Sequence, residues 1–124
     1  MKLTEEQIKA VLNEAVQKTV DSFRATEMND EDYARMEKDG LDEWDIADEK
    51  WTEILVGEYE VNGVPYSLES EMVSRSILKV DNLSILIDVS YDNYGKVEIL
   101  SDGISEDEKA IIMELVEETF DNVE

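Results

Sequence analysis

Aspartates recur at every third position in one acidic stretch of this chain, at Asp39, Asp42, Asp45 and Asp48. Carboxylates are the ligands that Ca²⁺ prefers, so this spacing first suggests a calcium loop. An EF-hand loop needs the pattern D-x-[DN]-x-[DN]-G and a glutamate at its twelfth position. The stretch "DGLDEWDIADEK" instead has glycine second and Trp44 sixth. We therefore expect no cofactor and no dedicated metal site, and at most weak divalent binding.

Other catalytic chemistries lack their usual residues. The 124-residue chain has no cysteine and no histidine, so it offers no thiol nucleophile and no imidazole to activate Ser74 or Ser76. Paired carboxylates could serve glycoside hydrolysis, but pairs are unavoidable among 33 acidic residues. The glycines form no loop that could cradle a phosphate. We expect that the protein is not an enzyme.

Charge is the property that points to a partner. The formal net charge is −22, and most of it lies in two segments: residues 27–60 hold 14 acidic and 3 basic residues, and residues 98–124 hold 10 and 1. The rest of the chain is close to neutral. Such acidity disfavours direct contact with nucleic acid or anionic lipid, and it favours a basic protein surface.

Within both segments, like charges lie at helical neighbour spacing, with Cβ atoms about 5–6 Å apart. That spacing is loosely comparable with the spacing of phosphates along a nucleic acid strand. Each such pair costs a few tenths of a kcal/mol, roughly, which interleaved lysines would avoid. We predict that these carboxylates form ion pairs with a partner's arginines and lysines. The predicted partner-binding residues are Asp30, Glu31, Asp32, Asp42, Glu43, Asp45, Asp48, Glu49, Glu114, Glu117, Glu118 and Asp121.

Apolar periodicity predicts the helices that must position these residues. Thr4 and Gln7 form a capping-box pattern ahead of an apolar face that recurs to Phe23. Asn29 can cap a short helix that ends at Gly40, with Tyr33 and Met36 facing inward. One or two further helical turns follow, in which Leu41, Trp44, Ala47 and Trp51 share one face, and we expect the two tryptophans to belong to the core. The last helix begins at Ser105, in a box with Glu108, and buries a stripe that runs to Val123.

Between these helices the apolar period changes to two. Asn62-Gly63 is a strong hairpin signal, Pro65 marks a strand start or an edge, and further turns are expected at Asp81-Asn82 and at residues 92–95. Alternation over Leu83, Ile85, Ile87, Val89 and Tyr91 predicts a central strand with one face on the core, while Ser84, Asp88 and Ser90 take the other face. We therefore predict one α+β domain over residues 1–124. It has an N-terminal helix, short acidic helices, an antiparallel four- or five-stranded meander, and a C-terminal helix packed on one sheet face.

The leading functional hypothesis is an inhibitor that imitates nucleic acid and occupies the basic site of a DNA- or RNA-binding enzyme, such as a nuclease. In size and acidity the chain is similar to phage anti-restriction and anti-CRISPR proteins that mimic DNA, which is a similarity of composition and not of motif. The alternative is a small acidic chaperone or immunity protein that binds a polypeptide through an apolar surface around Leu86 and Leu100. A third reading is an acidic, solvated domain that has no tight partner.

The N-terminal stretch "MKLTEEQIKAVL" lacks the apolar core of a signal peptide. No apolar run reaches the length of a transmembrane helix. With no cysteine for disulfides, we expect a cytoplasmic protein.

Overall fold

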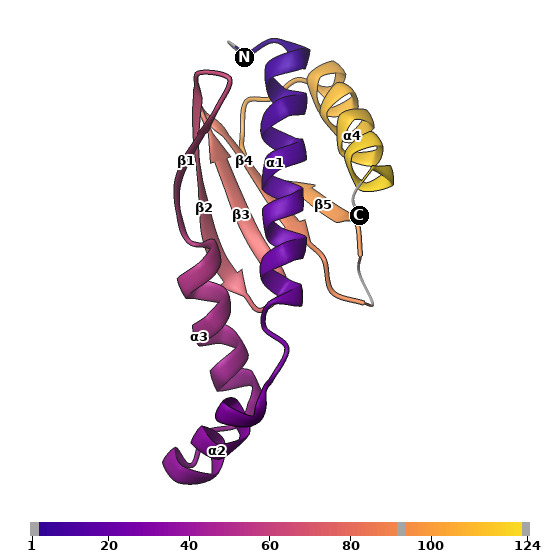
Figure 1. Cartoon of the computed structure of the whole chain (residues 1–124). Coiled ribbons are helices and arrows are strands. Elements are labelled where there is room, and N and C mark those ends of the chain that lie inside the picture. The colour runs from indigo at the N-terminus through magenta and orange to yellow at the C-terminus, as the bar shows by residue number, and fades with distance from the viewer. Residues whose placement is uncertain (1–2, 92–93, 123–124) are drawn as a thin grey trace.

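The computed structural model describes residues 3–91 and 94–122, which form one α+β unit (Figure 1). Its elements are α1 (Glu5–Arg24), α2 (Asp30–Asp39), α3 (Glu43–Leu55), β1 (Gly57–Val61), β2 (Val64–Met72), β3 (Arg75–Val80), β4 (Leu83–Asp88), β5 (Lys96–Ile99) and α4 (Glu106–Asp121). The strands form one antiparallel sheet in the order β1-β2-β3-β4-β5. The predicted α+β class, the meander and the C-terminal helix on the sheet are confirmed.

Tight turns set the register of the meander. Asn62 and Gly63 join β1 to β2 with φ values of 51° and 79°, the left-handed pair that a two-residue type I′ hairpin requires. Asp81, with φ of 53°, begins the two-residue turn between β3 and β4, in which Asn82 does not have a positive φ. Pro65 lies before Ser67, where the pairing of β2 with β3 begins, so its missing N–H removes no bond to β3. The predicted turn at residues 92–95 falls partly outside the described residues.

All of the packing helices lie on one face of the sheet (Figure 1). Helix α1 runs across the middle of that face and contacts α3 on one side and α4 on the other. Its capping box is formed as predicted: the Gln7 N–H donates to Thr4 Oγ1, and the Thr4 N–H donates to Gln7 Oε1. Helix α1 therefore occupies the central position over the core.

The core combines the apolar stripes of α1 and α4 with the helix-facing side chains of the strands. The most deeply buried members include Ala15 and Val16 of α1, Leu78 of β3, Ile85 of β4 and Trp51 of α3. A hydrogen bond of 2.9 Å joins the hydroxyl groups of Thr19 and Ser76 within this core, so neither buried oxygen is left without a partner.

The prediction that Trp44 and Tyr33 of the acidic segment face the core is wrong. Trp44 is 71% exposed and Tyr33 is 54% exposed, whereas Trp51 is fully buried and Met36 is half-buried. Trp44 and Trp51 do share one angular face of α3, being seven residues apart. The first turns of α3 extend beyond the sheet (Figure 1), so at Trp44 that face has no sheet to cover it.

The alternation predicted for β4 stops early. Leu83, Ile85, Ile87 and Val89 are buried, but Tyr91 is 94% exposed, and its ring meets the Phe23 ring in a T-shaped arrangement with the centroids 5.8 Å apart. Strand β4 ends at Asp88, so the period of two no longer governs Tyr91. The prediction that Tyr91 faces the core is wrong.

Asp88 lies on the helix-free face of the sheet, as predicted, yet it is buried. Arg75 Nε donates to Asp88 Oδ2 over 2.9 Å, and the Ser90 N–H donates to Asp88 Oδ1 over the same distance. Burial acts to raise the pKa of Asp88, but the hydrogen bonds from Arg75 and Ser90 outweigh it and hold that pKa below the usual value. The ionised carboxylate therefore stabilises the fold.

The two tryptophans of α3 offer a matched test of the fold. Trp51→Ala should lower the free energy of unfolding by about 3–5 kcal/mol, because it leaves a large cavity in the core. Trp44→Ala should change it by only about 0.5 kcal/mol or less, as for most exposed sites. Urea unfolding followed by circular dichroism measures both values, and equal losses would contradict the assigned burial.

Asp88→Asn should destabilise the protein by about 1–3 kcal/mol at neutral pH, since it removes the charge that Arg75 is paired with. The folded-state pKa of Asp88 is lowered, so its contribution is fully present above the unfolded pKa of about 3.9 and is lost as the pH falls through the folded pKa. Unfolding at a series of pH values should therefore show the two proteins converging below about pH 4. Glu69→Gln, which breaks the exposed Lys79–Glu69 pair, should have little effect at any pH.

Candidate functional site

Helices α2 and α3 form an arm that projects from one end of the sheet (Figure 1). We call residues 30–55 the acidic arm. The C-terminal part of α3 anchors it through Trp51 and Leu55, which belong to the core. Helix α2 has no buried residue and rests on α3. In the outer half of the arm, Ile46 of α3 is buried, and polar contacts between the two helices supplement this apolar contact.

Carboxylates begin both helices of the arm. Asn29 and Asp32 form a capping box at the start of α2, and Asp42 and Asp45 form a second one at the start of α3. Gly40 ends α2 with φ of 67°, a left-handed conformation that glycine adopts without penalty. Three predicted partner-binding residues, Asp32, Asp42 and Asp45, thus have a structural task as helix caps.

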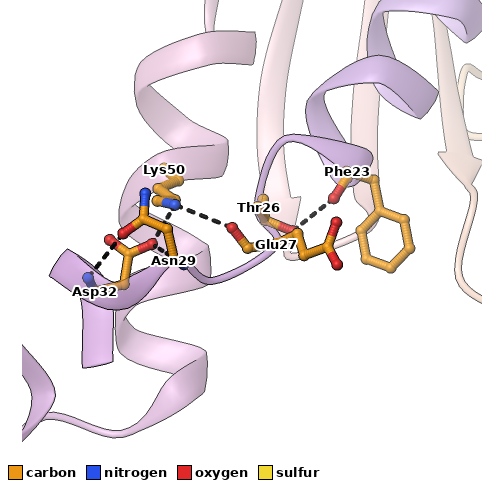
Figure 2. Close-up of polar contacts among 6 residues, drawn as sticks. All are labelled: Phe23, Thr26, Glu27, Asn29, Asp32 and Lys50. Carbon is orange, nitrogen blue, oxygen red and sulfur yellow. Dashed lines mark hydrogen bonds and ion pairs between the residues drawn. The ribbon is translucent and has the colours of Figure 1, made fainter.

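Lys50 of α3 ties the start of α2 to the chain that leads into it (Figure 2). Its Nζ pairs with Asp32 Oδ2 and also donates to the Glu27 carbonyl oxygen over 3.2 Å. The hydrogen bond from Lys50, followed by the backbone N–H of Asn29 as donor, lowers the pKa of Asp32. Figure 2 also shows the Thr26 hydroxyl donating to the Phe23 carbonyl oxygen at the end of α1. Asp32 thereby stays ionised within the arm.

Arg35 makes the second link between the helices. Its Nη2 lies 2.9 Å from Glu49 Oε2, and its Nε lies 3.6 Å from Asp39 Oδ2. Both sides of these pairs are nearly half exposed, so each pair contributes little alone. Arg35 and Lys50 are two of the three basic residues of the arm, and both are engaged in ion pairs within it.

The remaining predicted residues of the arm are Asp30, Glu31, Glu43 and Asp48, and all four are exposed. No ion pair joins these carboxylates to any basic side chain in the described part of the chain. Of the eight residues predicted here, these four are open to a partner, whereas Asp32, Asp42, Asp45 and Glu49 have partners within the arm.

The second predicted group, Glu114, Glu117, Glu118 and Asp121, lies exposed on α4. Glu118 approaches Lys9 of α1, with 3.5 Å between Oε2 and Nζ. Helix α4 packs on α1 and β5, whereas α3 packs on α1 and β2. The two acidic groups therefore lie on opposite sides of α1 and are not one continuous surface.

Sequence reasoning missed a groove at the base of α2. Tyr33 and Trp44 line it together with Met28 and Ala47, and its volume is about 270 Å³. The sequence pattern predicts both rings to face the core, because their spacing fits a buried helix face. The signal that could have corrected this is the shortage of other apolar residues in α2, whose sequence is DEDYARMEKD.

Among the described side chains, no group of three or more is arranged so that it could hold a metal ion. In the same residues, no helix is both long and apolar enough to cross a membrane.

Comparison of the chain with protein-family models, with curated proteins and with solved structures gave no match.

The geometry of the arm predicts different roles for its two lysines. Lys50→Met should loosen the start of α2, because Asp32 and the Glu27 carbonyl both lose their cationic partner. Lys38→Met is the matched control, since Lys38 is exposed and has no ion pair among the described residues. Hydrogen exchange should show faster exchange of the α2 amides in the first variant alone. Equal protection in both variants would mean that Lys50 does not hold the arm.

Proposed function

We propose that this protein is an inhibitor that binds the basic site of a nucleic-acid-binding enzyme, and that the acidic arm is the part that enters the site. The observation that carries the proposal is the exposure of Asp30, Glu31, Glu43 and Asp48 on a projecting pair of helices whose own Arg35 and Lys50 are already paired. Such an arm presents negative charge that the chain itself does not neutralise.

The energetics favour a basic partner. Uncompensated like charges on the arm repel one another, and a surface of arginine and lysine relieves that repulsion on binding. Opposite charge also accelerates encounter, and this effect weakens as salt screens the field. A polyanion is held by nucleic-acid-binding proteins through the same ion pairs and with the same sensitivity to salt.

We limit the proposal to one of the two acidic groups. The carboxylates of α4 lie beyond α1 from the arm, so a single narrow site on a partner cannot receive both groups in one approach. We assign inhibition to the arm, and we assign to α4 a contribution to solubility and to long-range attraction.

Binding through an apolar sheet surface is less well supported. On the helix-free face, the cross-strand pair Ile77 and Leu86 is half-buried, and the surrounding positions carry the Lys79–Glu69 and Arg75–Asp88 ion pairs. Leu100, at 43% exposure, lies just beyond the end of β5. This face is mixed in character and is not a continuous apolar patch.

Charge neutralisation at constant shape tests the proposal. The arm variant is Asp30→Asn, Glu31→Gln and Asp48→Asn, and the matched control is Glu114→Gln, Glu117→Gln and Asp121→Asn on α4. Tagged wild type and both variants serve as bait in nuclease-treated lysate, with bound proteins eluted in steps of rising salt and identified by mass spectrometry. A captured nucleic-acid-binding enzyme is then assayed for inhibition.

We expect the wild type and the α4 variant to retain the enzyme and inhibit it. The arm variant should bind it roughly 10- to 100-fold more weakly at low salt, because three ion pairs at about 0.5–1 kcal/mol each are lost. Affinities should converge as salt rises. Equal inhibition by all three proteins would refute the assignment to the arm, and a partner that resists high salt would favour the apolar mode.

A further inference from the structure

The groove at the base of α2 is lined by two exposed aromatic residues in an acidic setting. Trp44 is 71% exposed and Tyr33 is 54% exposed, and the groove that they line is also lined by Glu27 and Glu43. Tryptophan and tyrosine are enriched where proteins meet partners, because they supply large contact areas at low entropic cost. The position of these rings indicates a contact surface.

Size and charge limit what can occupy this groove. Its volume of about 270 Å³ lies below the roughly 300–1,000 Å³ of a site for a small organic ligand, and it suits a side chain presented by a partner. Anionic occupants are disfavoured by Glu27 and Glu43. A second copy of this chain is disfavoured too, since each copy carries a net charge of −22.

A cation is the occupant that is attracted both by the aromatic residues and by the acidic residues that line the groove. The face of an aromatic ring attracts a cation, with tryptophan the strongest. One such contact already exists within the chain, where Lys18 Nζ lies 4.5 Å from the centroid of the Tyr59 ring. Arginine suits the groove better than lysine, because its planar guanidinium stacks on a ring while its edge pairs with a carboxylate.

The arm does not fill the groove with its own arginine. Arg35 is engaged by Glu49 and Asp39, and Lys50 is engaged by Asp32 and the Glu27 carbonyl oxygen. We propose that the groove between Tyr33 and Trp44 receives an arginine side chain of the basic partner protein. This inference rests on the proposed function, since it names the contact that anchors the arm in its target.

Model peptides test the inference on the full chain before any partner is identified. The probes are three capped hexapeptides in which glycine alternates with arginine, with lysine or with citrulline, the last being close to arginine in shape but uncharged. Calorimetric titration gives the affinities. Tryptophan fluorescence reports on the groove, because Trp44 is exposed while Trp51, the other tryptophan of the chain, is buried.

We expect the arginine peptide to bind more tightly than the lysine peptide, and the citrulline peptide to bind weakest. Trp44→Leu and Tyr33→Leu should each weaken binding of the arginine peptide by roughly 3- to 30-fold, the range of a desolvated cation–π contact. Tyr94→Leu is the control. Tyr94 is 51% exposed, but its ring packs on Phe120 of α4, away from the arm. That variant should bind the arginine peptide as the wild type does.

The possible failures can be told apart. If neutralising Asp30, Glu31 and Asp48 abolishes binding while Trp44→Leu has no effect, the groove assignment is wrong and the proposed function stands. If Trp44→Leu weakens binding but neutralisation does not, the groove stands and the role of the arm's charges is wrong. Equal affinity for the arginine and lysine peptides would overturn the assignment to arginine, and tight binding of the citrulline peptide would overturn the cationic occupant altogether.

Discussion

The burial of α1 along the middle of one sheet face is the constraint on which the rest of this structure depends. Ala15 and Val16 of α1 are fully buried against the strands, and Thr19 is joined to Ser76 of β3. A nearly neutral helix therefore takes the position where charge would be most costly to bury. The acidic helices are left with the periphery: α4 on one side of α1, and the acidic arm at the end of the sheet on the other (Figure 1).

This placement gives the carboxylates of the arm two different tasks. Those at helix starts accept backbone N–H groups and face the positive end of the helix dipole, so they stabilise the fold locally. Asp32 accepts from the Asn29 N–H and Asp45 accepts from the Asp42 N–H, so both belong to this group. Asp48, which lies after the first turn of α3, has no such role and carries uncompensated charge. The net charge of the chain thus overstates the number of carboxylates that are open to a partner.

Much of the fold could be predicted because its signals are local. The Asn62-Gly63 hairpin, the Thr4 capping box and the alternation from Leu83 to Val89 each need only a few neighbouring residues, and each is found. The Ser105 cap is also found, although the Glu108 side chain accepts from the Ser105 hydroxyl and not from its backbone. Local patterns settle such features because the interactions themselves are local.

The candidate site could be predicted only in part, because its character depends on where each element ends in space. The carboxylates of the arm were identifiable by type, but which ones are caps and which are open depends on the packing of α2 on α3. Asp88 can be buried in its ionised form because it is paired with Arg75, which lies thirteen residues away on another strand. Helical spacing also places Trp44 and Trp51 on one face of α3. Trp51 is buried because the sheet covers that face, and Trp44 is exposed because it lies beyond the edge of the sheet.

The exposed Trp44 ring bears on the proposed imitation of nucleic acid by this arm. Phosphates alone explain the sensitivity of polyanion binding to salt, but proteins that hold single strands also stack aromatic and arginine side chains on the bases. An arm with carboxylates and no ring would reproduce the first interaction and not the second. Trp44 and Tyr33 provide flat faces beside Glu27 and Glu43, so an arginine that stacks on a base could stack on the arm instead. The aromatic groove and the open carboxylates are thus two parts of one proposed surface.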